Sequence, residues 1–314
     1  MTIRIAATAL LIAAPLCAQV PQATALYEQA RFEEAKRLLA PMTNNPDALF
    51  LLGKIALLQE DDEAATSILG KVVEARPANA DVQYWFGLAN RSVMMHSSFF
   101  KQPFYAGKMR EALEHAVQLD PNHFEARLAL IDYYIFAPAI AGGSEEKAIA
   151  QAAEVSKRDK FMGHRAYARM YIRQKKLDLA RKELLDAVRE QPASAAAHTA
   201  LGTFYGANDK DYPKGFAELE SAIKLDPNYM PAWFRIGQGA ALSGTNLPRG
   251  EEALKKYLAY RPKETEPGLV AAWFYLGSTY EKTGRKPEAR AAFANALAID
   301  PKWKDLQEAA VRVK

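Results

Sequence analysis

Cysteine is almost absent from this sequence. One cysteine, Cys17, occurs in 314 residues. A lone thiol excludes intrachain disulfides, and it cannot build the multi-thiolate metal sites typical of small zinc modules. If the N-terminal segment is removed as argued below, the remaining chain has no thiol, which also excludes a cysteine nucleophile. The fold must then be held together by its apolar core alone.

Long apolar runs and a strong net charge are also lacking. No segment beyond the N-terminus reaches the roughly 18 consecutive apolar residues that a membrane-spanning helix needs. The net charge of +4 is too mild to argue for a nucleic-acid partner. With 49% apolar and 25% charged residues, the composition is that of an ordinary globular protein. We expect a soluble mature protein with no integral membrane segment and no nucleic-acid partner.

The sequence contains no recognisable catalytic set. Phosphate-binding glycine loops and zinc-protease motifs do not occur, and the histidines stand apart from any pairing that defines a nucleophile or an acid–base couple. One group could ligate a metal by residue type, but it spans an ordinary helix–helix turn: His115, Asp120, His123 and Glu125. We expect no enzymatic activity, no cofactor and no metal.

The first 18 residues have the layout of a secretory signal peptide. A basic start at Arg4 precedes an apolar run that ends at Pro15, and Ala18 offers a small residue for cleavage. This pattern predicts a periplasmic or secreted protein whose mature chain starts after Ala18. Lipidation of Cys17 is the alternative, but Leu16 stands where lipoprotein processing sites have a small residue. A lipid-anchored form is therefore not favoured.

A repeat organises the rest of the chain, residues 19–314. Its clearest copy is "AAWFYLGSTYEKTGRKPEARAAFANALAIDP", in which small, aromatic and turn residues recur at helical spacing: Trp273, Leu276, Gly277, Tyr280, Gly284, Ala289, Phe293, Ala296 and Pro301. These residue types at these spacings resemble the tetratricopeptide repeat (TPR). Membership of that family implies pairs of antiparallel helices that pack through small residues. Gly284 is expected to end the first helix of this pair.

The same spacing of small residues and proline recurs along the chain. Examples are Gly53–Ala65–Pro77, Ala168–Ala180–Pro192 and, with one extra residue, Gly237–Gly250–Pro262. About eight units fit, followed after Pro301 by one amphipathic helix that would cap the stack. We therefore predict an all-α, right-handed superhelical solenoid with a concave inner face.

Two units are irregular. Residues at about 92–108 are rich in Met and Phe, and they could form a partner-binding lip. Alternatively, they could lengthen two helices and be buried between them, which is the outcome we expect. Residues 137–144 read as a stop, a turn and a restart, because Pro138 disfavours helix before it and Ser144 is a good N-cap. Both insertions could also join into one apolar lip if Phe136 and Ile140 lie beside the first.

The repeat phase assigns the inner face to the first helix of each pair. Arg165, Arg169 and Arg173 form one ridge there, suited to an acidic segment or a carboxylate unless Asp132 or Asp178 neutralises it. Aromatic and arginine side chains are enriched at binding hot spots. The predicted groove residues are Phe50, Tyr84, Leu128, Asp132, Arg165, Arg169, Arg173, Phe234, Gln238 and Phe274.

This architecture supports two functions. The first is an exported adaptor or assembly factor that binds a protein or peptide in an open, mixed groove. The second is a ligand-binding accessory of an envelope transporter, which predicts a closed and largely apolar channel. The sequence leaves the partner, the oligomeric state and the biological process open.

Overall fold

The computed structural model describes residues 16–263 and 265–313, and these ranges form seventeen α-helices and no strand. Most of the expected signal peptide lies outside the described residues. No helix within these ranges combines the length and apolar character needed to cross a bilayer. The first nine helices are α1 (Leu16–Glu28), α2 (Phe32–Leu39), α3 (Pro46–Leu58), α4 (Asp62–Ala75), α5 (Ala80–His96), α6 (Gln102–Leu119), α7 (Phe124–Phe136), α8 (Glu145–Arg158) and α9 (Lys160–Arg173).

The helices continue in the same alternating order to the C-terminus. Eight antiparallel pairs run from α1 and α2 to α15 and α16, so the predicted unit count is confirmed, and α17 follows them. Two short helical turns, η1 (Ala139–Ala141) and η2 (Tyr205–Asp209), interrupt the series. The remaining helices are α10 (Leu177–Glu190), α11 (Ala195–Phe204), α12 (Tyr212–Leu225), α13 (Met230–Ser243), α14 (Leu247–Leu258), α15 (Leu269–Lys282), α16 (Lys286–Ile299) and α17 (Lys304–Arg312).

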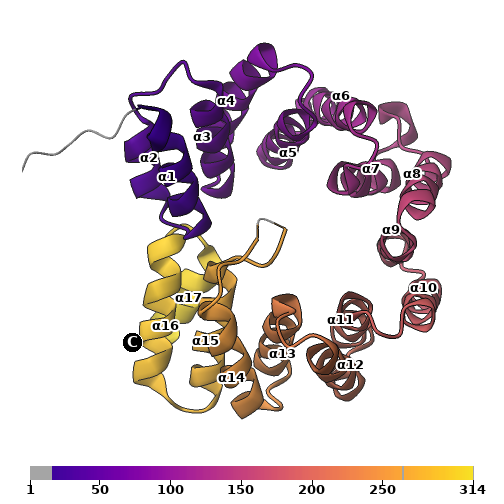
Figure 1. Ribbon diagram of the computed structural model, residues 1–314, viewed down its shortest axis with the longest axis vertical. Helices are drawn as coiled ribbons and strands as arrows, with labels where there is room; N and C mark the ends of the chain where they lie inside the picture. Colours follow the sequence, from indigo (N-terminus) through magenta and orange to yellow (C-terminus); the bar gives the residue numbers. More distant parts are fainter. Residues whose placement is uncertain (1–15, 264, 314) are drawn as a thin grey trace, which may run out of the picture.

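The stack of helix pairs closes into a ring (Figure 1). The first helix of each pair faces the central opening, and the second faces outward. The two ends of the solenoid meet at a seam, where Arg261 forms an ion pair with Glu28 and donates to the carbonyl of Ala25 at 3.3 Å. Lys302 also donates to the carbonyl of Gln59 at 3.0 Å. The ends are therefore joined mainly by exposed polar contacts.

Small residues set the distance between paired helices. A Cβ added to Gly237 would lie 2.2 Å from the Leu254 side chain, and one added to Gly277 would lie 2.5 Å from the Phe293 ring. Only glycine permits such close approach, which explains the regular spacing in the sequence. The core runs between successive pairs, and at the C-terminal end Leu306 of α17 is fully buried, as a capping helix requires.

The irregular unit at 92–108 lengthens both helices of its pair. Helix α5 extends to His96 and α6 begins at Gln102, with Pro103 in its first turn as expected. The expected burial of the insert is wrong, however. Met95, Phe99 and Phe100 are exposed, because the lengthened ends extend past the neighbouring pairs that would cover them.

The turn at 137–144 follows the sequence-based interpretation. Helix α7 ends at Phe136, and Ala137 before the proline is extended. Gly142 has a φ of 88°, in the left-handed region that glycine adopts readily, and the Ser144 hydroxyl accepts from the amide of Lys147 at 3.2 Å. Each of these residues has a conformational role in the join between α7 and α8.

The connection between α14 and α15 was not anticipated. It leaves the outer wall of the ring and turns toward the central opening (Figure 1). The Tyr257 hydroxyl donates to the carbonyl of Pro267 at 2.6 Å, which holds the last part of the loop against α14. The backbone amide of Lys263 donates to the Glu266 carboxylate at 2.8 Å and closes the turn. The inner loop, defined here as residues 261–263 and 265–268, forms one side of the site described next.

Candidate functional site

The inner side of the ring holds a cavity of about 630 Å³, here called the inner chamber. Helices α7, α9, α11 and α13 form its walls, and the inner loop covers one side. This volume lies within the roughly 300–1,000 Å³ of small-molecule pockets. Its charged lining residues are Glu125, Arg165, Arg169, Arg173, Arg235, Lys263 and Glu266.

Two chamber arginines share one carboxylate. Arg169 contacts Asp132 through two hydrogen bonds, Nε to Oδ1 at 3.0 Å and Nη2 to Oδ2 at 2.5 Å. Arg173 donates to the same two oxygens at 3.2 and 3.4 Å. Burial opposes the charge of Arg169, but the hydrogen bonds and attraction of Asp132 outweigh it and raise the Arg169 pKa. The trio carries a net charge of +1, so the neutralisation expected from Asp132 is partial.

The other two chamber arginines have no carboxylate within ion-pair distance among the described residues. Arg235 donates to the Gln238 side-chain oxygen at 2.7 Å, and its guanidinium lies 5.5 Å from the Phe234 ring centre. Burial lowers the pKa of Arg235, and the charge of Arg165 lowers it further. Because an arginine side chain stays protonated in proteins, two neighbouring cations remain uncompensated.

Apolar and neutral polar groups complete the chamber. The Thr199 hydroxyl is buried in the wall and has no hydrogen-bond partner among the described residues. Burial raises the pKa of Tyr229, whose ring borders the chamber. The apolar lining comes from Leu128, Phe161, Ile172, Phe204, Pro231 and Pro267. The lining is therefore mixed, as expected for an adaptor, and differs from the largely apolar channel expected for a transporter accessory, although the ring itself is closed.

All three arginines of the predicted ridge lie in the chamber. Leu128, Arg165, Arg169 and Arg173 line it, and Asp132 lies directly behind the last two arginines. Asp178, the other proposed neutralising group, instead pairs with Arg181 at 2.8 Å. The structure therefore brings these predicted residues together at one cavity, and their role in binding stays a prediction.

The other predicted groove residues lie elsewhere. Phe234 is 2% exposed, because Tyr257 and Tyr275 pack against its ring at 5.2 and 5.9 Å, so it is not an accessible groove side chain. Gln238 is partly buried and orients Arg235 while donating to the Tyr275 hydroxyl at 2.9 Å. Phe234 and Gln238 therefore pack behind the chamber wall and hold Arg235 and Tyr275 in place.

Phe50, Tyr84 and Phe274 are spread around the ring and do not line the chamber. The Lys54 ammonium lies 5.4 Å from the Phe50 ring centre, and Tyr84 packs on His123 at 4.8 Å. Phe274 packs on Trp303 at 4.7 Å, close to the C-terminal cap. They do not form one continuous aromatic groove with the arginines.

Sequence reasoning missed Arg235 and the inner loop. The signal for the loop was in the spacing, since Trp233 follows Pro227 by six residues but Trp273 follows Pro262 by eleven. Arg235 was missed because its neighbour Phe234 was assigned to the inner face instead. A one-residue error in helical phase rotates a side chain by about 100°.

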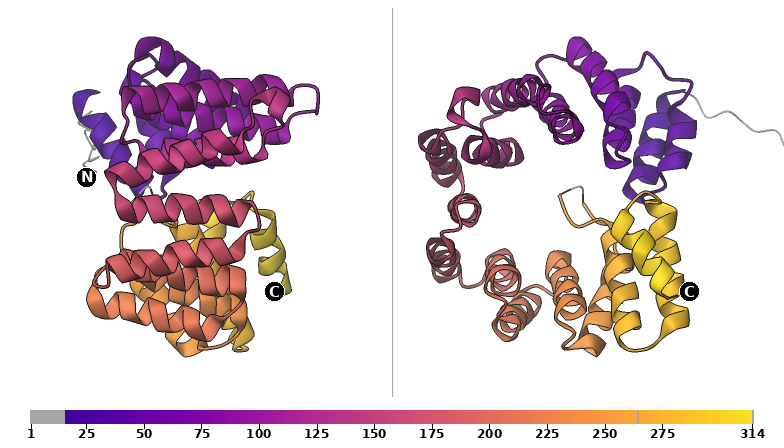
Figure 2. Two further views of the ribbon diagram at one scale, coloured as in Figure 1. Left: turned by 90° about the vertical axis from the view of Figure 1, so that its right-hand side faces the viewer. Right: turned by 180° about the vertical axis from the view of Figure 1, so that it is seen from behind.

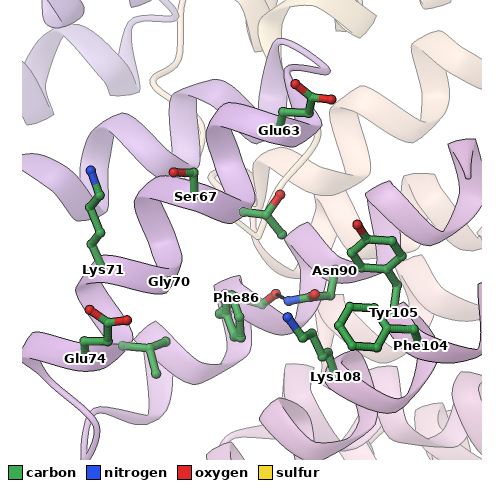
Figure 3. Close-up of a pocket in the computed structure, with 12 residues that line it drawn as sticks. Glu63, Ser67, Gly70, Lys71, Glu74, Phe86, Asn90, Phe104, Tyr105 and Lys108 are labelled. Atoms are coloured by element: carbon green, nitrogen blue, oxygen red, sulfur yellow. Dashed lines mark hydrogen bonds between the residues drawn. The ribbon is translucent and has the colours of Figure 1, made fainter. Parts of the chain in front are cut away.

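A second hollow of about 600 Å³ lies on the outside of the ring, between α4, α5 and α6 (Figure 3). Its charged groups are two carboxylates and two ammonium groups: Glu63, Lys71, Glu74 and Lys108. Because these charges balance, the outer hollow lacks the charge excess that distinguishes the inner chamber. We therefore take the chamber as the candidate site.

Two family models match this chain. The model of the TRAP transporter T-component family matches residues 16–207, which include α7, α9 and the chamber residues that they carry. The tetratricopeptide repeat model matches residues 270–303, the copy of the repeat that is clearest in the sequence.

Two curated relatives match part of this chain. A chloroplast TPR protein, PYG7 of Arabidopsis thaliana, is 34% identical over 136 residues, covering 42% of this chain and 43% of its own. The general transcriptional corepressor ssn6 of Schizosaccharomyces pombe is 25% identical over 122 residues, 39% of this chain and 11% of its own. The chain thus spans less than half the length of either relative.

Two solved structures match most of the length of this chain at low sequence identity. The Cut9–Hcn1 hetero-tetramer of the APC/C has a TM-score of 0.46 at 14% identity, covering 94% of this chain and 55% of its own. A monomeric human IFIT1 mutant bound to m7Gppp-AAAA has a TM-score of 0.48 at 20% identity, covering 88% and 67%.

Proposed function

The chain belongs to the TRAP transporter T-component family, and from this premise we propose that it is an accessory protein of an envelope transporter that binds an anionic ligand in the inner chamber. The ligand class is a carboxylate or a similar oxyanion. The proposal rests mainly on the two chamber arginines, Arg165 and Arg235, that have no carboxylate partner among the described residues.

Charge favours this ligand class. The described chamber lining has five cationic side chains and two carboxylates, and Asp132 behind it adds a third. Holding cations in a partly buried site is costly, and a bound anion offsets that cost. Guanidinium groups also match the planar, two-oxygen geometry of a carboxylate. The chamber is therefore suited to an oxyanion with some apolar surface.

A second candidate function is the adaptor role that TPR repeats imply. In that case the chamber receives an acidic segment of a partner protein rather than a free solute. The mixed lining favours this possibility, since a peptide needs both charged and apolar contacts. The inner loop favours a small ligand, because it occupies part of the central opening that a peptide would need (Figure 1).

Calorimetric titration distinguishes these possibilities. We would titrate the protein with acetate, succinate, citrate and phosphate, and separately with eight-residue peptides carrying acidic side chains. We expect one of the small acids to bind, and the variant Arg235→Gln to weaken that binding by about tenfold or more, because a buried charge-assisted contact is lost. Arg165→Gln should weaken it in the same direction.

The matched control is Arg189→Gln, an identical substitution on the outer helix α10, where Arg189 pairs with Asp186. It should leave affinity unchanged. Binding of peptides but of no small acid would support the adaptor role instead. Absence of binding by every anion, or equal affinities of the wild type and Arg235→Gln, would overturn the proposal for the chamber.

We also propose that the protein is exported with cleavage after Ala18. Such cleavage removes only the start of α1 and keeps Ala23, which is fully buried against the first pair. Intact-mass measurement of the protein from a cell-envelope fraction tests this directly. A mass that includes residues 1–18 would contradict it, and a mass with a lipid on Cys17 would favour the anchored form.

A further inference from the structure

An exposed apolar surface occurs at the two irregular turns of the ring. Phe99 and Phe100 lie at the tip between α5 and α6 and are 78% and 90% exposed. Ile140 in η1 is fully exposed, at 100%. We call the whole set the aromatic edge: Met95, Phe99, Phe100, Phe104, Phe136 and Ile140. Large apolar side chains exposed together on two neighbouring turns are a candidate interaction surface.

The topology places both turns on the same side of the ring. Each connects the first helix of a pair to the second, and in a stack of antiparallel pairs all such turns share one edge. The pairs are successive, and η1 packs beside α6. A Cβ added to Gly142 would lie 2.7 Å from Arg110 Nη1, so the second turn lies against the body of α6. Figure 2, left, shows them at the same edge of the ring.

Basic residues are concentrated on the first of these turns, while carboxylates lie at its border: Glu111 and Glu114 are 3.8 Å from Arg110, and Glu63 and Glu74 share the outer hollow with Lys108. Residues 82–110 contain no Asp or Glu and four basic residues, Arg91, Lys101, Lys108 and Arg110. The Lys108 ammonium lies 4.5 Å from the Phe104 ring centre, at the border of the outer hollow (Figure 3). On the other turn, the Arg173 guanidinium lies 5.5 Å from the Phe136 ring centre. Cations therefore flank the exposed rings on both turns.

We propose that the aromatic edge docks on the surface of a bilayer that contains anionic phospholipid. Phe99 and Phe100 enter the boundary between headgroups and acyl chains, and Lys101 and Lys108 bind lipid phosphates. The exposure favours lipid over a protein partner, because Phe99 and Phe100 are almost fully exposed at the tip between two helices, whereas protein hot spots lie in well-packed pockets. Association with the cell envelope, which the family implies, puts such a surface within reach.

Vesicle co-sedimentation tests this docking. The full chain would be mixed with vesicles of phosphatidylglycerol and phosphatidylcholine, or of phosphatidylcholine alone. We expect binding to the anionic vesicles that falls about tenfold or more in Phe99→Ser/Phe100→Ser, and a smaller loss in Lys101→Gln, because apolar insertion and electrostatic attraction add. Val311→Ser is the matched control, since Val311 on α17 is 60% exposed but lies far from the edge.

A site-specific probe distinguishes insertion from loose adsorption. Because Cys17 is the one cysteine, Cys17→Ser gives a background in which Phe100→Cys can be labelled with an environment-sensitive dye. Vesicles should shift its emission to the blue, while the same dye at Val311→Cys should not respond. Circular dichroism of each variant checks folding.

Three results would overturn the proposal. The first is equal vesicle binding by the wild type and Phe99→Ser/Phe100→Ser, and the second is no response from the dye at position 100. The third is sedimentation velocity that shows a wild-type dimer, without lipid, that the double variant abolishes. That last result would assign the aromatic edge to a second copy of the chain.

Discussion

Charged groups are treated differently on the two sides of this ring. On the outward-facing helices, guanidinium groups commonly face carboxylates: Arg181 pairs with Asp178 and Asp209, and Arg249 pairs with Glu220 and Glu252. In the inner chamber, Arg169 and Arg173 share one carboxylate, and two further arginines have none among the described residues.

The outer ion pairs and the inner arginines differ in how they affect the stability of the protein. Exposed outer pairs contribute little to stability, since water and salt screen them, and they keep the surface soluble. Arg235 is largely removed from water, so its missing partner has a real cost, whereas Arg165 is exposed. This contrast is what the proposed anion binding in the chamber would explain.

The largest expected effect comes from breaking the inner pairing. Asp132→Asn removes the carboxylate that Arg169 and Arg173 share. Because both arginines are about 40% exposed, we discount the cost of breaking a buried pair and expect a loss of about 2 kcal/mol in the free energy of unfolding, measured by urea denaturation. Affinity for the chamber anion should rise in the same variant.

The matched control for this change is Asp178→Asn, in which the lost carboxylate is 94% exposed. It should cost about 0.5 kcal/mol or less. Equal effects of the two substitutions would mean that inner and outer charges are not distinguished by burial.

A smaller effect is expected on the outside. Arg249→Gln removes ion pairs with Glu220 and Glu252 and a contact with the Trp233 ring at 4.7 Å. We expect a loss of about 1 kcal/mol in unfolding free energy, mostly from the ring contact, and no change in anion affinity. High salt should reduce the stability difference between this variant and the wild type, and a difference that persists undiminished would contradict the screening argument.

The smallest expected effect is a dependence on pH. Lowering the pH should reduce stability through the outer carboxylates, whereas anion affinity in the inner chamber should not change near neutral pH. Hydrogen bonding to Arg76 lowers the pKa of Asp47, and partners also lower the pKa of other outer carboxylates such as Glu251 and Glu288. A folded-state pKa below the unfolded value adds stability that is present above about pH 4 and is lost as the pH falls through the folded-state pKa.

The urea midpoint should therefore fall between about pH 5 and pH 3. Anion affinity should stay constant from about pH 6 to pH 9, because arginines do not titrate there. A strong change in affinity across that range would show that a titrating group, rather than the arginines, controls the chamber.

The sequence predicted the repeat architecture well because its causes are local. The spacing of Gly237 and Gly277 sets contacts within one helix pair, and Pro138 and Ser144 act on their own turn. The arginine ridge was found for the same reason, since Arg165, Arg169 and Arg173 are four residues apart on one helix.

Closure of the ring was not predicted, because it depends on small rotations summed over all eight pairs. The burial of Phe234 depends on Tyr275 in the next pair, which the phase of one helix does not reveal. The exposure of Phe99 and Phe100 was not predicted. The sequence indicates that α5 and α6 are lengthened, but burial of their ends also requires neighbouring helices of similar length, and the neighbouring helices are shorter.

The seam between Glu28 and Arg261 has a consequence for how this protein can evolve. An open solenoid can gain or lose a unit at either end and only change in length. In a ring the rotations of all units must add up to one full turn, so a duplicated or deleted unit would separate the two ends. The number of units in this protein is therefore fixed by geometry, and variation in length is confined to its turns.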